Sequence, residues 1–375
     1  MFLKKLSLQN FRNFTRKEFE FSDKAGTGSA WDKQTTVIVG PNASGKTNIL
    51  EAIYLLATGK SFHAGYEEEM IKEGEEVGRV EGRVMSDPLR PSASEASESK
   101  TNLDVILTRG MLNGARVSRK KLSVNGVSKR LYNFVGNLRA VLFGPWDLGL
   151  VTESPSTRRR FLDFVLSQVD REYRRSLLSY EKGLRQRNKV LERIKEEDAN
   201  HSQLLFWDKL LIKNGTYLTA KRQEFIDFTN ATGSPGEEIF ALEYDRSPIS
   251  EARLAQYAQE EVEACATLVG PHRDDIRFKI KNEKLKMKNG RDLAIYGSRV
   301  EQRMGVLWLK LAELEFIAYI NGQRPVLLLD DIFSELDHRH HEVVMGVVGK
   351  QQTIITTADP HNIQNRRAEA EIIEL

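Results

Sequence analysis

Cysteine is almost absent from this sequence of 375 residues, and that scarcity restricts the kinds of site it can build. The single Cys265 excludes a disulfide framework within the chain and a cysteine-rich zinc site. Long apolar runs are missing too, and none approaches the roughly 20 residues that a helix needs to cross a bilayer. The opening residues, MFLKKLSLQNFRNF, alternate polar and apolar side chains and lack the apolar stretch of a signal peptide. We therefore expect a soluble, cytoplasmic protein without a membrane partner.

The net charge of the chain is also small. A balance of +3 favours an acidic partner only weakly, so any nucleic-acid surface has to come from local clustering of cations. At 40% hydrophobic and 29% charged residues, the chain can bury a core and stay in solution. Its length predicts two or three packed units.

A phosphate-binding loop stands near the start of the chain. The segment TTVIVGPNASGKTNILEAIYLLATG, residues 35–59, indicates a buried strand, a glycine-rich turn and a helix. The turn matches the P-loop pattern in full, and its residues are Gly40, Pro41, Asn42, Ala43, Ser44, Gly45, Lys46 and Thr47. In such a loop backbone N–H groups surround an anion, the lysine reaches the β- and γ-phosphates, and the threonine hydroxyl binds Mg²⁺. A structural glycine turn would not explain Lys46 and Thr47.

An acidic strand lies nearly 300 residues further on. In VLLLDDIFSELD, residues 326–337, four apolar residues precede two carboxylates, at the strand end where α/β proteins form their sites. A buried pair of adjacent carboxylates is costly without a cation. We therefore expect Asp330 to hold Mg²⁺ with Thr47 and Asp331 to position the attacking water.

The residues between these motifs predict two kinds of structure. Residues 77–143 show alternating strands and turns, with a solvated loop at SDPLRPSASEASESKT and a hairpin turn at Asn125-Gly126. Residues 155–231 show a helical pattern broken near EEDANH, which predicts a long helical hairpin. Residues 298–320 predict a further helix, and RPVLLLDDIF and QQTIITTAD predict buried strands of a parallel sheet.

The motifs together resemble one family. LSLQNFRNF, GPNASGKTN, SPSTRRRFLD, GPHRDD, EQR, LLLDDIFSELD and TIITTAD occur in the order typical of the RecF family of recombination-repair proteins, and they span nearly the whole chain. Each motif alone is weak evidence for the family, whereas the occurrence of all of them in this order is specific to it. The resemblance implies an α/β fold: an ABC-type P-loop ATPase head with a mainly helical second lobe and no long coiled coil.

The resemblance also implies a domain plan and a function. Residues 1–150 and 301–375 would form lobe I, the ATPase lobe, and residues 151–300 would form lobe II. ATP with Mg²⁺ would join two copies head to tail around DNA at single-strand/duplex junctions, and slow hydrolysis would release it. The mediator proteins RecO and RecR are the partners that the family implies.

The resemblance assigns further residues to the site. Arg12 would contact nucleotide phosphate, although turn chemistry is an equal alternative. The signature that acts on the partner's ATP would comprise Ser298, Glu301, Gln302 and Arg303, and a dimer loop would include Ser334 and Asp337. The family signature SQGQQR reads here SRVEQR, so Val300 replaces a glycine and restricts the backbone. Ser298 and Glu301 also fit a capping box, which is the simpler role.

Several cationic and polar clusters leave two interpretations open. The segment 116–130 carries six basic residues and no acidic ones, so Arg119, Lys120 and Lys121 are either DNA contacts or a solvated surface. Arg158 and Arg159 follow a predicted helix start and need an anion, which is either DNA or an internal carboxylate. GPHRDD favours a turn over a metal site, and Trp146, where relatives carry an acid, favours buried packing over nucleotide sensing.

Two other classes of function compete with this prediction. An ATPase subunit of a membrane transporter would share the P-loop, but it has no place for SPSTRRRFLD and GPHRDD. A nucleotide-switched DNA-binding scaffold with little or no hydrolysis is favoured by Val300.

Overall fold

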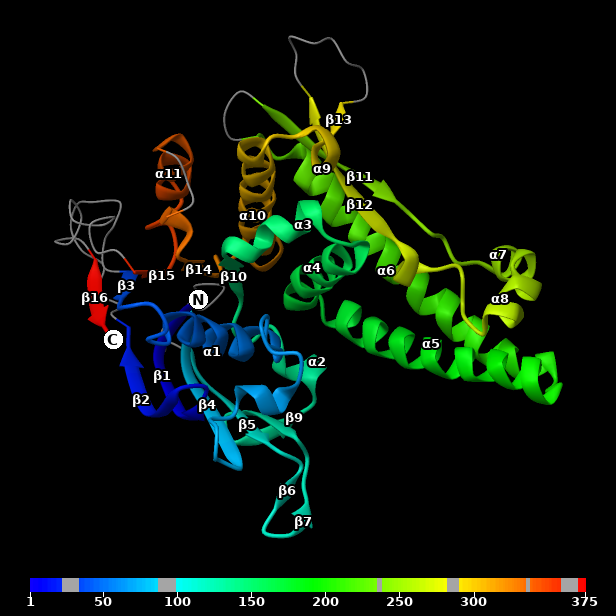
Figure 1. Cartoon of the computed structure of the whole chain (residues 1–375), viewed down its shortest axis with the longest axis horizontal. Helices are drawn as coiled ribbons and strands as arrows, with labels where there is room; N and C mark the ends of the chain where they lie inside the picture. Colours follow the sequence, from blue (N-terminus) through cyan, green and yellow to red (C-terminus); the bar gives the residue numbers. More distant parts are fainter. Residues whose placement is uncertain (22–33, 87–98, 235–237, 282–289, 335–337, 359–369) are drawn as a thin grey trace, which may run out of the picture. The chain divides into compact units, whose positions relative to one another are not determined.

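The computed structural model divides the chain into two compact units, whose elements are labelled in Figure 1. Unit 1 comprises residues 1–147 and 313–375, and unit 2 comprises residues 148–312. The second division falls inside a continuous helix, α10 (Arg299–Asn321), rather than at its start as the predicted domain plan had it. The described residues are 1–21, 34–86, 99–234, 238–281, 290–334, 338–358 and 370–375.

A five-stranded parallel sheet carries the P-loop in unit 1. Its strand order is β10 (Ala140–Phe143), β14 (Val326–Asp330), β15 (Thr353–Thr357), β3 (Thr35–Val39) and β16 (Glu371–Glu374). Every neighbouring pair runs parallel, and β14 and β15 are buried at every position. The prediction of buried parallel strands is confirmed for β14 and β15, which are rich in apolar and β-branched residues, as strands covered on both faces are.

A six-stranded antiparallel sheet forms the rest of the β structure of unit 1. Its order is β2 (Phe14–Glu20), β1 (Phe2–Phe11), β4 (Val77–Ser86), β5 (Ser99–Thr108), β8 (Lys120–Val124) and β9 (Val127–Lys129), and β6 (Met111–Leu112) pairs with β7 (Ala115–Arg116) beside it. Asn125 and Gly126 both have positive φ, as a two-residue hairpin turn requires, so the predicted hairpin is confirmed. Most of the predicted solvated loop, residues 87–98, lies outside the described residues.

Helix α1 (Lys46–Thr58) shares one hydrophobic core with both sheets. Every residue from Ile49 to Thr58 is buried, and the apolar ones belong to one core cluster with leucines of β1 and with Ile38, Leu328 and Ile354 of the parallel sheet. Gln352 also joins the two sheets, because its side chain accepts from the Leu3 amide at 2.7 Å and donates to the Leu3 carbonyl at 2.8 Å. Smaller helical elements complete unit 1: η1 (Glu67–Met70), α2 (Leu131–Phe134), η2 (Pro145–Leu148), η6 (Ile332–Ser334) and α11 (His338–Met345).

Unit 2 is built around a helical hairpin, but the first arm that the sequence predicted as one helix is divided at Asp170, whose extended backbone separates α4 (Pro155–Val169) from α5 (Arg171–Glu197). Helices α5 and α6 (Leu204–Ala231) are joined where Asp198 adopts a left-handed conformation and ends α5. The other elements are α3 (Gly149–Thr152), η3 (His201–Gln203), α7 (Glu251–Gln256), α8 (Ala258–Ala264), η4 (Pro271–Arg273), α9 (Leu293–Tyr296) and the sheet of β11 (Ile239–Asp245), β12 (Asp275–Lys281) and β13 (Arg291–Asp292). With 27 and 28 residues, α5 and α6 form a short pair and no long coiled coil, as predicted.

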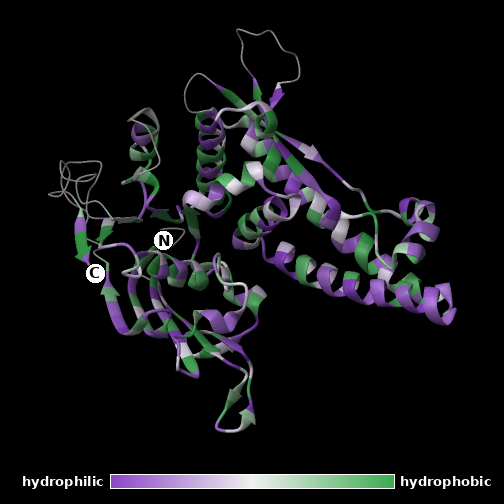
Figure 2. Cartoon of the chain, viewed as in Figure 1, coloured by the Kyte–Doolittle hydropathy of each residue, from purple (hydrophilic) through white to green (hydrophobic). Residues whose placement is uncertain are grey.

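Figure 2 shows that most of helix α5 in unit 2 is hydrophilic. In the portion of the chain that the structure describes, no helix combines the length and the apolar character needed to span a bilayer.

Candidate functional site: a P-loop and an acidic strand end

The P-loop connects β3 to α1, and its shape depends on glycine. Gly45 has φ of +102°, a conformation that L side chains rarely adopt. A Cβ at this position would lie 2.6 Å from the Asn13 amide and 2.8 Å from the Phe14 ring. Asn13 Nδ2 also donates to the Ser44 carbonyl at 3.0 Å. The turn between β1 and β2 therefore packs directly onto the loop and supports it.

Lys46 lies over the loop rather than in solvent. It is 8% exposed, and its Nζ donates to the carbonyls of Gly40 at 2.6 Å and Pro41 at 2.8 Å. The hydroxyl of Ser44 is buried and has no hydrogen-bond partner among the described residues. A buried, unpaired hydroxyl and a buried ammonium beside a helix N-terminus are a donor set that suits phosphate oxygens.

Asp330 meets the P-loop at the carboxyl end of β14. Thr47 Oγ1 donates to Asp330 Oδ2 at 2.8 Å, and Thr356 of β15 donates to Oδ1. Burial raises the pKa of the Asp330 carboxyl, the two threonine hydroxyls oppose this, and the neighbouring Asp331 adds to the rise. A hydroxyl and a carboxylate oxygen this close together are hard ligands of the kind that Mg²⁺ prefers. The residues present therefore fit a magnesium-bound phosphate group.

Asp331 is where the chain leaves the sheet. Its φ is +46°, and its amide donates to the Thr356 carbonyl at 3.1 Å. Aspartate tolerates the left-handed conformation better than most residues. This turn gives the two adjacent carboxylates different environments: Asp330 is 4% exposed, whereas Asp331 is only half-buried.

Arg12 has internal partners. Its Nε and Nη2 each donate to the Glu51 carboxylate at 2.7 Å, and its Nη1 donates to the Glu69 carbonyl at 2.8 Å. Glu51 belongs to α1 and is 1% exposed, so this is a buried, bidentate ion pair. The geometry favours turn chemistry for Arg12, the second of the two interpretations. A sequence signal for Glu51 existed, since it is the one acidic residue in the apolar stretch NILEAIYLL.

Trp146 differs from its prediction of buried packing. It is 38% exposed, and its ring stacks on Phe62 with the centroids 4.8 Å apart. Phe62 in turn meets Tyr54 of α1 edge to face. One face of the indole rests on Phe62 and its benzo ring lies close to Gly144, so Trp146 is a partly exposed aromatic and not a core residue.

The signature segment lies in unit 2 at the start of α10. The capping box is formed: the Ser298 amide donates to Glu301 Oε2 at 2.7 Å, and the Glu301 amide donates to Ser298 Oγ at 3.2 Å. Gln302 is buried and donates to the carbonyls of Leu293 and Gly297. Val300 is 51% exposed, so its side chain fills no core. Arg303 is half-buried in the same helix.

The predicted dimer loop is described only in part. Ser334 ends the short helix η6, and Asp337 lies outside the described residues.

Arg158 has the internal carboxylate of the second interpretation, whereas the partner of Arg159 is a backbone carbonyl. Arg158 is 8% exposed, and its Nε and Nη2 donate to the two oxygens of Asp275 at 2.7 and 3.0 Å. Arg159 donates to the Asp274 carbonyl at 2.9 Å. The burial and pairing of Arg158 favour the internal ion pair over a DNA contact.

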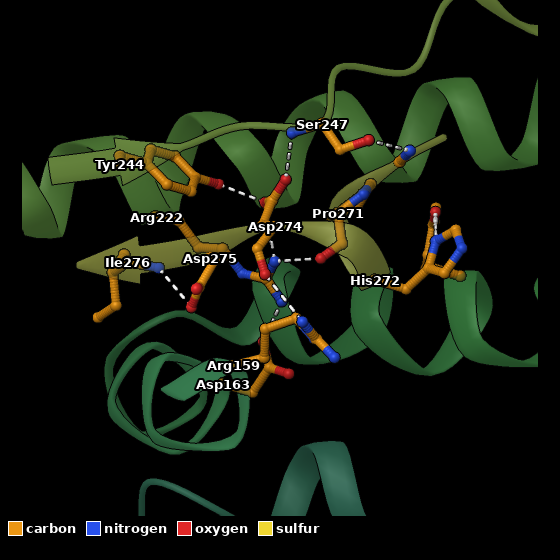
Figure 3. A network of polar contacts seen from close by, with 12 residues as sticks. Arg159, Asp163, Arg222, Tyr244, Ser247, Pro271, His272, Asp274, Asp275 and Ile276 are labelled. Atoms are coloured by element: carbon orange, nitrogen blue, oxygen red, sulfur yellow. Dashed lines mark hydrogen bonds and ion pairs between the residues drawn. The ribbon is translucent and has the colours of Figure 1, made fainter. Parts of the chain in front are cut away.

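The motifs SPSTRRRFLD and GPHRDD meet in one buried network, shown in Figure 3. Asp274 is fully buried and accepts from Arg222, from Tyr244 and from the Ser247 amide. Arg222 also donates to Asp163 at 2.8 Å and to the Pro271 carbonyl at 2.6 Å. This network joins α4, α6 and the β11–β12 pair, and within the described ranges no three potential ligands gather as a metal site would need. The prediction of a turn before β12 is confirmed.

The basic hairpin β8–β9 presents only part of its charge to solvent. Arg119 and Lys121 are exposed, as are Lys129 and Arg130. Lys120 pairs with Glu67 and donates to the Gly59 carbonyl at 3.0 Å. Successive residues of a strand point to opposite faces, so Lys120 faces the end of α1 while Lys121 faces outward.

A P-loop on a parallel sheet, an acidic strand end two strands away and a second antiparallel sheet define the class of ABC-type ATPase heads. In agreement, a family model described as "RecF/RecN/SMC N terminal domain" matches residues 2–373. The "DNA replication and repair protein RecF" of Bacillus thuringiensis (strain Al Hakam) is 32% identical over 97% of this chain and 94% of its own length, and that of Bacillus cereus (strain AH187) gives the same values.

Solved structures agree with the sequence comparison. A structure described as "the recombination mediator protein RecF-ATPrS in RecFOR pathway" has a TM-score of 0.81 and 29% identity, covering 100% of this chain and 96% of that one. The corresponding "RecF-ATP" structure has a TM-score of 0.80 and 30% identity, covering 96% and 92%. The chain belongs to the RecF family of DNA replication and repair proteins.

Proposed function

We propose that this chain is an ATP-dependent DNA clamp. ATP with Mg²⁺ binds at residues 40–47 and joins two copies head to tail, and the dimer closes on duplex DNA beside a single-strand/duplex junction. Slow hydrolysis reopens it during recombinational gap repair and replication restart. RecO and RecR are the proposed protein partners, by relation to the RecFOR pathway named for similar structures.

One observation carries the proposal: the Thr47 hydroxyl and the Asp330 carboxylate are 2.8 Å apart at the mouth of the P-loop. In the proposed roles these two oxygens hold the metal, Lys46 and Ser44 hold phosphate, and Asp331 orients water. Such positioning and charge neutralisation account for most of the catalysis in phosphoryl transfer. Mg²⁺ held by Thr47 and Asp330 would neutralise charge on the phosphate oxygens.

The composite site needs residues of both units. Ser298 and its helix start are proposed to meet the γ-phosphate bound by the other copy, with Glu301, Gln302 and Arg303 supporting that helix start. Ser334 and Asp337 are proposed to lie at the dimer contact. Arg12 is given a structural role in place of the phosphate contact that the family resemblance implies, because its guanidinium is already paired with Glu51.

A switch with little hydrolysis is the second candidate, and the capping box favours it. The capping box occupies the backbone N–H groups of Ser298 and Glu301, so phosphate has to compete with the capping side chains for these two donors. Turnover measured against ATP affinity separates the two candidates: a scaffold binds ATP as tightly as an ATPase and releases no phosphate.

Substitution of Lys46 tests the proposal directly. Lys46→Met removes the buried ammonium, and we expect loss of ATP binding and of ATP-dependent DNA retention, measured by nucleotide titration and by sedimentation with duplex DNA. Lys60→Met is the matched control, since Lys60 is an exposed lysine just beyond α1, and it should behave as wild type. Normal ATP-dependent DNA retention in a folded Lys46→Met protein would contradict the clamp.

A further inference from the structure

A second hairpin of unit 1, the β6–β7 hairpin (residues 110–118), has no part in the proposed nucleotide site. Its two short strands form a sheet of their own, and Figure 1 shows them extending away from the larger antiparallel sheet. Its turn residues, Asn113 and Gly114, have φ of +48° and +77°, as a two-residue hairpin turn requires. All of residues 110–118 are exposed or half-buried, so packing in the core does not explain their side chains.

The root of this hairpin is held by Thr108, the last residue of β5. Its hydroxyl donates to the Ser118 carbonyl at 2.9 Å and accepts from the Gly110 amide at 3.1 Å. Its amide donates to the Arg119 carbonyl at 2.8 Å, and the Val117 amide donates to the Gly110 carbonyl at 3.1 Å. Because these bonds join both arms to the end of β5, the hairpin is ordered before it meets a partner, which lowers the entropic cost of binding.

Unpaired cations follow the hairpin into β8. Residues 109–130 contain seven basic residues and no acidic one. Arg116, Arg119 and Lys121 are exposed, and none of them makes an ion pair with a residue that the structure describes. Three exposed cations without a counter-charge favour an anionic partner.

Acidic residues adjoin the hairpin on one side of its root. Arg109 Nε donates to the Glu75 carbonyl at 2.9 Å, and the neighbouring Glu76 is exposed. Both glutamates directly precede β4, which borders β5 on the edge opposite to β8. Glu67 is already paired with Lys120, which faces the end of α1. A polyanion on the β8 side therefore meets the three unpaired cations away from Glu75 and Glu76.

One face of the hairpin combines an apolar and a basic side chain. Met111 and Arg116 are directly opposite each other in the pairing of β6 with β7, so their side chains lie on the same face. Met111 is 48% exposed. The major groove of duplex DNA is about 12 Å wide and admits a two-stranded β-ribbon, whereas the minor groove is about half as wide. In the major groove an apolar side chain can meet a thymine methyl while cations meet the phosphates.

We propose that the β6–β7 hairpin enters the major groove of duplex DNA, with Met111 against base edges and Arg116, Arg119 and Lys121 on phosphates. This inference rests on the proposed function, because its partner is the duplex that the clamp holds. An acidic protein segment would also attract these cations, but a projecting hairpin fits into a groove of its partner, whereas extended peptides bind in grooves or along sheet edges of the protein.

Photo-cross-linking from the DNA tests the groove contact. A duplex with 5-iodouracil in place of each thymine carries its photoreactive iodine where the thymine methyl stood, in the major groove. The full chain is irradiated with this duplex, ATP and Mg²⁺, and the cross-linked peptides are identified by mass spectrometry. We expect a cross-link at Met111 that is lost in Met111→Ala. Cross-links that all lie outside residues 110–118 would overturn the proposal.

The salt dependence of duplex affinity separates the two kinds of contact. We expect Met111→Ala to weaken binding several-fold with an unchanged slope of log affinity against log salt, and Arg116→Ala to reduce the slope by about 0.9. Lys182→Ala, at an exposed cation of α5, is the matched control and should keep the wild-type affinity and slope. ATP binding should be intact in all variants.

Two outcomes distinguish a failure of this inference from a failure of the clamp. Wild-type affinity and slope in both hairpin variants, the result expected if the hairpin instead meets an acidic protein, would overturn the groove contact and leave the clamp standing. Absence of duplex binding by the wild-type protein with ATP and Mg²⁺ would overturn both.

Discussion

In this protein, the partners of a buried charged residue distinguish a structural role from a role in the nucleotide site. Arg222 and Glu51 have charged partners within the chain, so their burial is compensated locally. Asp330 is buried as well, but its hydrogen-bond donors are the neutral hydroxyls of Thr47 and Thr356. Burial raises the pKa of the Asp330 carboxyl, and the adjacent Asp331 adds to the rise. A divalent cation would compensate this buried charge.

His272 makes the stability of unit 2 depend on pH. Its Nε2 faces the Thr267 carbonyl at 3.0 Å, which only accepts, so Nε2 carries the proton and Nδ1 accepts from Tyr180 at 2.8 Å. Burial lowers the pKa of His272 to about 4 from 6.5. A depressed pKa gives stability that is complete above pH 6.5 and is lost as pH falls toward 4. One pKa unit is about 1.4 kcal/mol, so the loss reaches about 3 kcal/mol.

Denaturant unfolding between pH 7.5 and pH 5 measures the first part of this loss, about 2 kcal/mol, in wild type and in His272→Gln. We expect the variant to have the shallower dependence, because Gln does not titrate. His63→Gln, at an exposed histidine, should keep the wild-type dependence. Parallel curves for wild type and His272→Gln would show that His272 is not the titrating group.

Among the elements, turns and hairpins decide what the sheets present. The β1–β2 turn packs on the P-loop through Asn13. In the β8–β9 hairpin, successive cations face inward and outward in alternation. Lys120 forms an ion pair with Glu67, so the outward-facing cations Arg119 and Lys121 are the better candidates for DNA contacts in that segment.

The double variant Arg119→Ala with Lys121→Ala tests this hairpin. We expect weaker duplex binding for all sequences, and a slope of log affinity against log salt smaller by about two, since each lost phosphate contact contributes about 0.9. Fluorescence anisotropy at several salt concentrations provides both quantities. Lys182→Ala with Arg185→Ala removes two exposed cations of α5 and should leave the slope unchanged. An unchanged slope in the hairpin variant would exclude phosphate contacts there.

At the scale of the whole molecule, the two nucleotide motifs and the signature belong to different units. The P-loop and the acidic strand lie in unit 1, and Ser298 lies in unit 2, on the helix α10 that continues into unit 1. Because α10 belongs to both units, one continuous helix links the proposed ATP contact at Ser298 in unit 2 to unit 1.

Solution mass with and without ATP and Mg²⁺, in the presence of duplex DNA, tests the whole assembly. We expect wild type to dimerise with ATP and Val300→Gly to dimerise several-fold more tightly, because glycine at this helix start allows closer approach to phosphate. Val300 is half exposed, so the substitution leaves the core intact. Monomers for both proteins under all conditions would contradict the composite site, and tighter dimers for wild type would assign Val300 a favourable contact.

The local sequence pattern by itself determined much of the secondary structure and the phosphate-binding loop of this protein. The P-loop, the buried strands, the Asn125-Gly126 turn and the helical hairpin were predictable, because backbone geometry and hydrophobic period depend on residues close together in the chain. The ordered motifs also determined the family.

Only the tertiary structure decided which partners the charged residues have. Arg158 reaches Asp275 across 117 positions, and Thr47 reaches Asp330 across 283. Arg12 is committed to Glu51, and Trp146 stacks on Phe62. The division between units inside α10 was likewise invisible in its sequence, because the helix is regular on both sides of it. Ion pairs and packing between distant residues depend on how the elements fold together, and no short stretch of sequence encodes them.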